Sequence, residues 1–406
     1  MSSEQKSFSS NFIEDPKEGV EASNTDPNKE MSDQEKMVSE YQEYRNKLAN
    51  EILSVSKGER KCVLEDAKKL RQYWEASLFK IEQRRVLYDE YPTEEPIPTV
   101  ELVSKYLSEE DRPTGEKIVF EVDDRDVYNI SAPVRVGDKQ YIVGRMEKRS
   151  EWAKSQVAFF AENEADGVWE KDPSLPFYDL EDSFVTRVGD EIVFGGVRVW
   201  QAPNKPDGWV DWQTVFYRGK DLENMKEFAH SPVGMKDVRL AEFSDGTIGV
   251  FTRPLGGVAG RGKIGFAHIN SLEELTPEKL IRARVLKEKF IAEEWGGVNE
   301  VHVLPDGKVG VIGHISAYDN EKNKHYYAMS FVYDPETHQS SKIKIIATRE
   351  DFPKGAAKVA NEKVPNELVD IVFPGGIVGL NDDFVTLYCG LSDTEAGRIK
   401  IKNPFK

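Results

Sequence analysis

Acidic and amide side chains open five strand-like segments of this chain, and each opening is followed by a tight turn and a second apolar segment that ends near glycine. The five openings are Asp126 to Asn129, Glu181-Asp182, Lys236-Asp237, Asn299-Glu300 and Asp370. Carboxylates gathered in one pocket can donate a proton to a glycosidic oxygen and stabilise an oxocarbenium-like centre. The sequence alone does not rank these carboxylates, because an Asp at the start of a strand often only caps a turn.

The turns inside these units contain Gly-Asp, Asp-Gly or Asn-Asp pairs, which are typical of β-hairpins. They recur roughly 50 to 75 residues apart, which is the spacing of propeller blades rather than of βαβ units. The turns begin at Gly137, Gly189, Asp245, Asp306 and Asn381. In a propeller the first strand of every blade lies next to a common axis. The sequence therefore predicts an all-β fold, a five-bladed β-propeller over residues 117–406, with the polar openings facing one pocket.

Basic side chains are expected in the same layer as these carboxylates. They are Arg145, Lys236, Arg239, Arg253 and His314. Any one of them is explained by an ordinary ion pair. Together they favour an anion beside the carboxylates, such as a phosphorylated substrate or an attacking phosphate. The histidines are scattered and no thiol cluster exists, so the sequence predicts no metal and no other cofactor.

The first 110 residues differ in character from the rest. Residues 1–34 are rich in Ser, Glu, Asp, Asn and Lys and predict a disordered tail. Residues 35–110 hold two apolar stripes of helical period, which predict a helical hairpin and linker, with a short helix around Val100 to Leu107. Such a pair usually buries its stripe, so we expect it to pack on the propeller or to form a homo-oligomer. A regulatory or docking role is the alternative.

The composition excludes several classes of protein. The formal net charge of −17 disfavours nucleic acid or an anionic membrane as a partner, since both need a basic face. Only Cys62 and Cys389 are present, which excludes a disulfide framework and favours a reducing compartment. The first residues lack the apolar core of a signal peptide, and no apolar run is long enough to span a bilayer. We therefore predict a cytoplasmic protein.

The propeller part resembles the β-1,2-mannoside phosphorylases and, more closely, the related mannosyltransferase and mannan phosphorylase family of protozoa and bacteria. The resemblance covers residues 117–404, and Leu180-Glu181-Asp182 matches the Glu-Asp catalytic motif of the phosphorylases. Residues 372–376 and 388–393 match their last blade. The most similar stretches are Arg125 to Ile130, Met235 to Leu240, Gly249 to Pro254, Glu294 to Glu300 and His325 to Tyr327.

The resemblance implies an inverting enzyme that moves mannose reversibly between β-1,2-linked oligomannosides and inorganic phosphate, giving α-mannose 1-phosphate, or that takes mannose from GDP-mannose. Asp182 would be the general acid, protonating the glycosidic oxygen directly or through a sugar hydroxyl. The residues that would bind the sugar are Asn129, Arg145, Tyr326 and Asp393, and those that would bind phosphate are Lys236, Arg253 and His314. From the propeller pattern we add Asp126, Asp237 and Glu300 as further substrate-binding residues.

The chain departs from the phosphorylase pattern at two places. Ser183-Phe184 follow the Glu-Asp pair where the phosphorylases have Pro-Arg, and Asn299-Glu300 stand where those enzymes have a phosphate-binding lysine. These differences favour the transferase-type relatives. Two other functions stay open at this point: a glycoside hydrolase that uses water on the same scaffold, and a non-catalytic glycan-binding propeller. The hydrolase does not need the basic cluster, and the binding protein would show no turnover.

Overall fold

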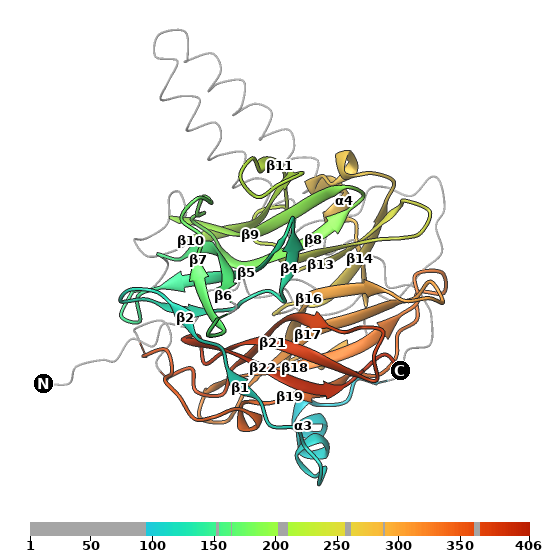
Figure 1. The fold of residues 1–406 in the computed structure, drawn as a ribbon. Coiled ribbons are helices and arrows are strands. Elements are labelled where there is room, and N and C mark those ends of the chain that lie inside the picture. The colour runs from blue at the N-terminus through green and yellow to red at the C-terminus, as the bar shows by residue number, and fades with distance from the viewer. Residues whose placement is uncertain are drawn as a thin grey trace, which may run out of the picture. The chain divides into compact units, whose positions relative to one another are not determined.

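The computed structural model describes residues 95–151, 154–163, 165–201, 210–255, 261–286, 289–360 and 366–406. Within these residues five sheets follow one another along the chain and form the blades of a β-propeller (Figure 1). The all-β, five-bladed prediction is therefore confirmed. The predicted tail over 1–34 and the helical hairpin before residue 95 lie outside the described residues. The short helix expected around Val100 to Leu107 is present as α3 (Thr99–Leu107).

Each of the first four blades is built on an antiparallel meander of four strands. Blade 1 contains β2 (Phe120–Glu121), β3 (Asp126–Tyr128), β4 (Val134–Val136), β5 (Lys139–Glu147), β6 (Gln156–Asn163) and β7 (Val168–Lys171), of which β4 and the parallel outer strand β2 are additional to the meander. Blade 2 contains β8 (Glu181–Val188), β9 (Glu191–Gln201), β10 (Val210–Gly219) and β11 (Lys226–His230). Blade 3 contains β12 (Lys236–Glu242), β13 (Ile248–Arg253), β14 (Ile264–Ile269) and β15 (Arg284–Leu286). Blade 4 contains β16 (Trp295–Val303), β17 (Val309–Tyr318), β18 (Lys324–Tyr333) and β19 (Lys344–Ala347).

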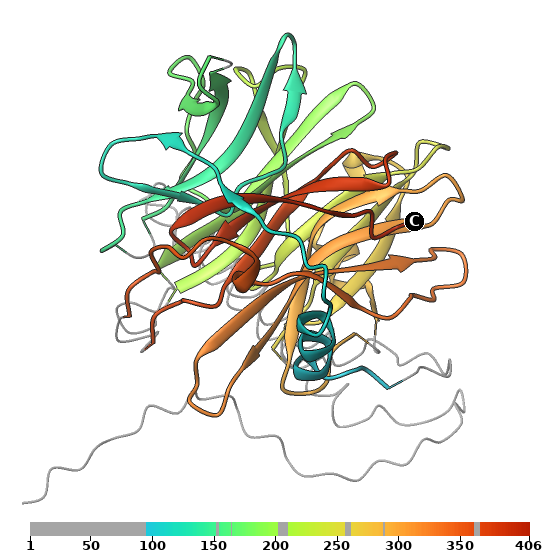
Figure 2. The same ribbon diagram turned by 60° about the horizontal axis from the view of Figure 1, so that its bottom comes forward.

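Blade 5 is completed by a strand from the opposite part of the sequence. It contains β20 (Val372–Val378), β21 (Phe384–Leu391) and β22 (Glu395–Lys402), and its outer strand is β1 (Glu116–Lys117). Glu116 pairs with Arg398 and Lys117 with Gly397 in antiparallel register, and Figure 2 shows this N-terminal segment beside the red strands of blade 5. The ring of blades is thus closed by hydrogen bonds between segments far apart in the sequence.

Two short helical pieces lie on the connection between β14 and β15. They are the 3-10 turn η2 (Leu272–Glu274) and the helix α4 (Pro277–Ile281), whose N-cap Thr276 accepts a hydrogen bond from the Lys279 amide. A further 3-10 turn, η4 (Arg349–Asp351), follows β19. No helix in the described part of the chain is long and apolar enough to cross a membrane.

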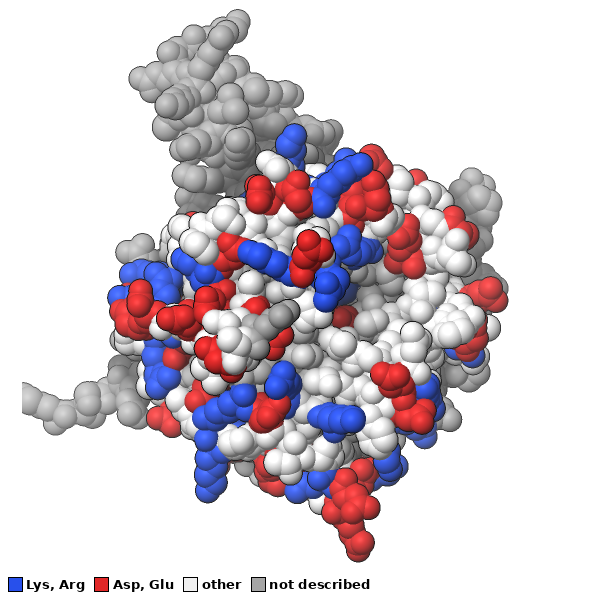
Figure 3. All heavy atoms as spheres, in the orientation of Figure 1, with Lys and Arg blue, Asp and Glu red and all other residues white. Residues whose placement is uncertain are grey.

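The core consists of apolar clusters that each join two neighbouring blades. Phe184 of β8 packs with Val238 and Leu240 of β12, for example, and Phe251 of β13 packs with Val311 of β17. Because the alternating side chains of each sheet bury themselves against the next sheet, the inner strands are held in a ring around one axis. On the face shown in Figure 3, acidic and basic side chains are mixed rather than gathered into a patch of one sign.

Candidate active site

An unusual backbone conformation recurs where the inner strands of the first three blades begin or end. Asn129 (φ 46°), Asp182 (φ 45°) and Asp237 (φ 55°) all lie in the left-handed region, which Asn and Asp tolerate better than other side chains. The pairing of β8 with β9 and of β12 with β13 shifts at Asp182 and at Asp237, so both residues lie in β-bulges. A bulge re-aims a side chain out of the regular alternation of a strand. These polar groups therefore meet near the axis, where Asn129 Nδ2 donates to Asp182 Oδ1 at 2.9 Å.

Asp182, in blade 2, lies between three donors from blades 1 and 3. Its Oδ1 accepts hydrogen bonds from Asn129 Nδ2 (2.9 Å) and Arg145 Nη1 (3.2 Å), whereas its Oδ2 lies 3.8 Å from Lys236 Nζ. Burial raises the pKa of Asp182, but Arg145 and Lys236 together outweigh burial and hold that pKa below its ordinary value. The carboxyl group is thus ionised at neutral pH, with one oxygen fixed and the other facing a lysine.

Arg145 clamps the carboxylates of this region. One end of its guanidinium reaches Asp182, and Nη2 lies 3.2 Å from Glu181 Oε1 and 3.4 Å from Glu147 Oε2. Its Nε donates to Ser155 Oγ at 2.8 Å. Burial raises the pKa of Glu181, and the neighbouring Asp182 raises it further against the opposing effect of Arg145. The pKa values of the adjacent Glu181 and Asp182 are therefore pushed in opposite directions, as in sites where two carboxyl groups have different roles.

A second layer behind Arg145 was missed by the sequence analysis. Glu147, 1% exposed, accepts from Tyr128 Oη at 2.5 Å and from Lys358 Nζ at 2.9 Å. Glu147 is on the same face of β5 as Arg145, two residues away, and Tyr128 precedes Asn129 in a stretch that resembles the family. These two positions were accessible from strand alternation. Lys358 comes from the connection between β19 and β20, and nothing local in the sequence marks it.

Asp237 has a different environment from Asp182. It is 1% exposed, and its Oδ2 accepts from Arg253 Nη1 at 2.6 Å and lies 3.9 Å from His314 Nε2. Burial raises the pKa of Asp237, but Arg253 and Lys236 lower it far more, so the net pKa is well below its ordinary value. Asp237 Oδ1, Arg253 Nε and His314 Nε2 are buried and make no hydrogen bond within the described residues. Their hydrogen-bonding capacity is available to a ligand.

His314 links this pair to an aromatic side chain. Its Nδ1 lies 2.8 Å from Asn299 Oδ1, and its ring stacks on Tyr326 with the ring centres 5.4 Å apart. Burial, together with Arg253 and Lys236, lowers the pKa of His314 to about 3 against the opposing effect of Asp237. The ring is therefore neutral, and with Nδ1 donating to Asn299 its Nε2 is an acceptor. His314 can accept a hydrogen bond from a hydroxyl or a protonated phosphate, but it adds no positive charge.

Tyr326 and Asp393 complete the cluster from blades 4 and 5. Burial raises the pKa of Tyr326, but Lys324, Lys236 and Arg253 lower it more, and Trp295 Nε1 approaches its hydroxyl at 3.4 Å. Asp393 also has a left-handed conformation (φ 51°), and burial raises its pKa although Arg145 opposes the effect. Asp393 is the carboxyl group of this cluster that, with Glu181, most readily keeps a proton.

Most of the residues predicted for the site lie in one connected cluster. Those in it are Asn129, Arg145, Asp182, Lys236, Asp237, Arg253, His314, Tyr326 and Asp393. Their arrangement places an ionised carboxylate beside cations and the unpartnered Arg253 Nε donor, which suits the binding of an anion next to a group that exchanges protons.

Three predicted positions lie elsewhere. Asp126 forms a bidentate pair with Arg149 (2.6 and 2.9 Å), away from the cluster. Glu300 Oε2 accepts from the Ile377 amide (2.7 Å) and lies 2.6 Å from His302 Nε2, in a separate pocket. The reason is the bulge between Val298 and Glu300, which turns Asn299 toward His314 and its neighbour the other way.

Asp370 also lies outside the cluster, two residues before the inner strand of blade 5, which begins at Val372. Asp370 instead binds His325 Nδ1 (2.6 Å) and the Tyr327 hydroxyl (2.7 Å). The bulge of blade 5 lies between Pro374 and Gly376, so this blade presents glycine where the others present Asn or Asp.

Fold and cluster together define a five-bladed propeller with buried carboxylates and cationic side chains gathered where its inner strands meet. Residues 107–406 match the family described as "Protein of unknown function (DUF1861)". Two solved structures are similar over most of their length. A mannose phosphorylase from Leishmania mexicana in complex with a phosphate ion, MPT-4, is 35% identical, with a TM-score of 0.68 over 75% of this chain and 93% of that one. MPT-1 from the same organism, a GDP-Man-dependent mannosyltransferase, is 33% identical, with a TM-score of 0.67 over 76% of this chain and 95% of that one.

The chain therefore belongs to this family, and its identity to the two Leishmania enzymes confirms the resemblance inferred from its residues. No curated protein sequence matches the chain significantly.

Proposed function

We propose that this protein is a mannoside phosphorylase or mannosyltransferase, with Asp182 as its acid/base group and β-1,2-linked mannosides as its substrates. The observation that carries the proposal is the position of the Asp182 carboxylate, with Oδ1 fixed by Asn129 and Arg145 and Oδ2 3.8 Å from Lys236 Nζ. One oxygen is thereby oriented and the other is left for a proton and a substrate. The two Leishmania relatives support the same pair of activities.

In phosphorolysis, phosphate would lie against Lys236 and Arg253, with His314 Nε2 accepting its remaining proton. A phosphate oxygen forms the new bond to the anomeric carbon while the glycosidic bond breaks. Asp182 gives its proton to the departing oxygen, directly or through a sugar hydroxyl. The products are α-mannose 1-phosphate and a mannoside shorter by one sugar. Lys236 and Arg253, including the unpartnered Arg253 Nε, stabilise the anion in the transition state.

The protonation of Asp182 depends on what is bound. Lys236 and Arg145 lower its pKa in the unliganded protein, and a phosphate dianion against Lys236 would offset that effect and raise the pKa. The same carboxylate can then serve as acid when phosphate is present. In its ionised state it is ready to accept the proton of an acceptor hydroxyl, which is the need of the transfer direction, with mannose 1-phosphate or GDP-mannose as donor.

A hydrolase requires a second carboxylate that activates water. Asp237 is one candidate, but its Oδ2 is held by Arg253 Nη1 at 2.6 Å and its side chain is 1% exposed. The basic residues would also have no role in hydrolysis. These observations favour transfer to or from phosphate over transfer to water.

Product analysis of the purified protein tests the proposal. The protein is incubated with β-1,2-mannobiose and longer oligomers, with and without inorganic phosphate, and separately with GDP-mannose or mannose 1-phosphate and a mannoside acceptor. Mannose 1-phosphate that forms only with phosphate, or a lengthened mannoside from either donor, is the expected result. Free mannose formed equally without phosphate would indicate a hydrolase. Absence of turnover in every arm, with glycan binding retained, would indicate a binding protein.

A further inference from the structure

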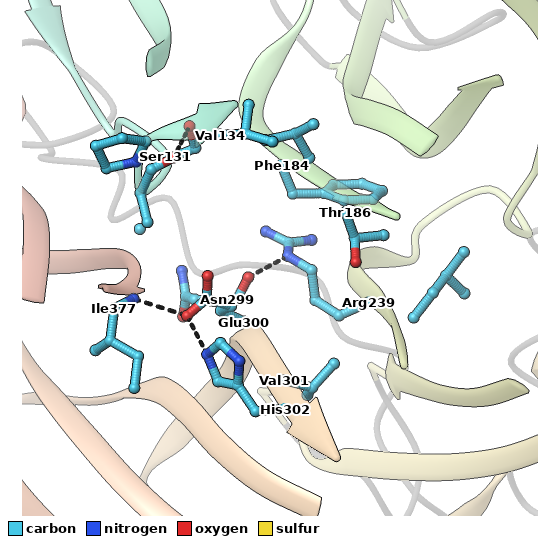
Figure 4. A pocket seen from close by; sticks show the side chains of 15 residues that line it. Ser131, Val134, Phe184, Thr186, Arg239, Asn299, Glu300, Val301, His302 and Ile377 are labelled. Carbon is cyan, nitrogen blue, oxygen red and sulfur yellow. Dashed lines mark hydrogen bonds and ion pairs between the residues drawn. The ribbon is translucent and has the colours of Figure 1, made fainter. Parts of the chain in front are cut away.

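A pocket of about 200 Å³ lies where the inner strands of the propeller meet (Figure 4). All five blades line it with their inner strands or the segment next to them. The lining comes from Ser131 to Val134, Phe184 to Thr186, Arg239 and Leu240, Asn299 to His302, and Gly375 and Ile377. Phe184 and Arg239 each follow the bulged Asp of their strand by two residues, which is about 7 Å along a strand. The pocket is therefore an axial cavity of its own rather than part of the catalytic cluster.

Arg239 is the central charged group of this axial pocket. It is 4% exposed, and Figure 4 shows its guanidinium pointing into the pocket between Phe184 and Asn299. Its Nε donates to the Asn299 carbonyl (2.7 Å), its Nη1 donates to the Val238 carbonyl (3.0 Å), and its carbon lies 4.5 Å from the centre of the Phe184 ring. Within the described residues it has no ion pair, and its Nη2 makes no hydrogen bond.

The one carboxylate that lines the pocket is already neutralised. Glu300 Oε2 is 2.6 Å from His302 Nε2 and accepts from the Ile377 amide. Burial lowers the pKa of His302, but Glu300 raises it more, which favours the charged pair. The positive charge of Arg239 therefore stays uncompensated, and burial lowers its pKa despite the more distant Asp237 and Asp182. A buried cation without a counter-ion destabilises the fold, so a bound anion would be favourable.

A second buried donor borders the same space. Asn299 is 4% exposed and its Nδ2 has no hydrogen-bond partner among the described residues, while its Oδ1 is bound to His314 Nδ1. A guanidinium edge and an amide N–H₂ group together form the donor set that oxyanions require. A volume of about 200 Å³ holds a small anion with a few waters, each of which takes about 30 Å³.

We propose that the axial pocket binds a small oxyanion, of phosphate or carboxylate chemistry, on Arg239 Nη2 and Asn299 Nδ2. The site is separate from the phosphate position assigned to Lys236 and Arg253. Because the Asn299 amide also contacts His314, an anion on Nδ2 fixes the orientation of the amide and with it the tautomer of His314. The axial anion would thus be a structural ligand that supports the catalytic cluster from behind.

The test uses the full chain and selenate, whose anomalous scattering separates an anion from water. Crystals grown without phosphate or sulfate are soaked in selenate, and a peak next to Arg239 is expected in addition to any peak near Lys236 and Arg253. Arg239→Met should lose only the axial peak. Arg187→Met, an exposed arginine of β8 that donates to the Arg135 carbonyl, is the matched control and should keep it.

Solution measurements show whether the site is occupied outside crystals. Phosphate and formate are titrated separately while the melting temperature is followed. The anion that gives a saturable rise in melting temperature shows whether the pocket prefers a phosphate or a carboxylate. Thr186→Glu supplies a carboxylate within the pocket lining and keeps the proposal testable if Arg239→Met fails to fold. It should raise the melting temperature and abolish the axial peak. No axial peak at saturating selenate, or a peak with no saturable change in solution (an adventitious ion only), would overturn the proposal without affecting the proposed enzyme activity.

Discussion

Blades 2 and 3 place the same side chain in the same backbone conformation, yet they give it different environments. Asp182 and Asp237 both occupy a bulge with positive φ at the start of an inner strand. Asp182 keeps an oxygen that faces only Lys236 at 3.8 Å, whereas Asp237 is paired with Arg253 at 2.6 Å. The repeated bulge thus fixes where a carboxylate lies, and the residues of the neighbouring strands decide whether it is free to react.

The difference comes from the arginine that each carboxylate meets, which belongs to blade 1 for Asp182 and to blade 3 for Asp237. In blade 1 this arginine is Arg145, which is shared among Glu147, Glu181 and Asp182. In blade 3 it is Arg253, which pairs with Asp237 alone within the described residues. The shared Arg145 contacts only Oδ1 of Asp182 and leaves Oδ2 facing Lys236, whereas Arg253 pairs with Asp237 at 2.6 Å. We therefore expect substitutions at Asp182 to affect turnover and substitutions at Asp237 to affect stability.

The largest expected effect is the loss of catalysis in Asp182→Asn. Removing a general acid costs about 10² to 10⁴-fold in rate. The free energy of unfolding should change by only about 1–2 kcal/mol, because Arg145 keeps Glu147 and Glu181. Steady-state kinetics and urea unfolding measure the two quantities. Asp126→Asn, whose carboxylate pairs with Arg149, is the control and should retain turnover. A variant with near wild-type kcat would remove Asp182 from the mechanism.

Asp237→Asn should instead destabilise the fold strongly. The substitution leaves Arg253 as a buried unpaired cation, which costs about 3–5 kcal/mol. Urea unfolding of the single variant and of Asp237→Asn with Arg253→Met gives the test, since the double variant should recover part of the loss. If Asp237→Asn were as stable as the wild type, the comparison between the two blades would be wrong.

Lys358→Met examines whether Arg145 needs its support. Lys358 Nζ donates to Glu147 Oε2 at 2.9 Å, and Glu147 in turn holds Arg145. Without this support Arg145 should be displaced, which should lower kcat by on the order of 10-fold to 100-fold, with KM for phosphate little changed. Lys354→Met, in the same connection, is the control. An equal loss in both variants, or a change in KM alone, would indicate a role other than positioning.

The smallest effect is expected in the acid sensitivity of stability. The pKa of His314 is lowered to about 3, so the folded protein binds fewer protons there than the unfolded chain, whose histidine pKa is about 6.5. Its contribution to stability is fully present above pH 6.5 and declines as pH falls from 6.5 toward 3, by up to about 1.4 kcal/mol per pH unit. Unfolding at pH 7 and pH 5 should show a smaller difference for His314→Gln than for the wild type. Equal differences would place a charged imidazole in the folded state.

The blades and the first three polar positions were predictable from the sequence, because turn chemistry and strand alternation are local. Asn129, Asp182 and Asp237 stand at strand ends in the printed sequence and remain there in space. Asp370 was expected to face the pocket but does not, because nothing local in the sequence distinguishes a residue just before the inner strand from one inside the bulge. Glu300 was expected in the same cluster for a related reason. The one-residue bulge turns Asn299 toward the cluster and Glu300 to the other side of the strand.

The supporting residues could not be predicted, because their partners are distant in the sequence. Lys358 and Glu147 are separated by 211 positions, and only the closed ring brings them together. The same holds for Arg239, whose unpaired state depends on five blades meeting at one axis. Local patterns give the residues that face the pocket, whereas the charges that set their pKa values depend on packing between blades.

The pairing of β1 with β22 has a consequence for the way the chain is made. Lys117 and its ion-pair partner Glu395 are separated by 278 positions, so β1 leaves the ribosome long before the strand it needs exists. Blades 1 to 4 can form as they emerge, but blade 5 stays one strand short until β22 arrives. Contacts of such long range form late and slowly. During synthesis the ring of blades therefore stays open until β22 pairs with β1. That late pairing closes the ring on which the pocket depends.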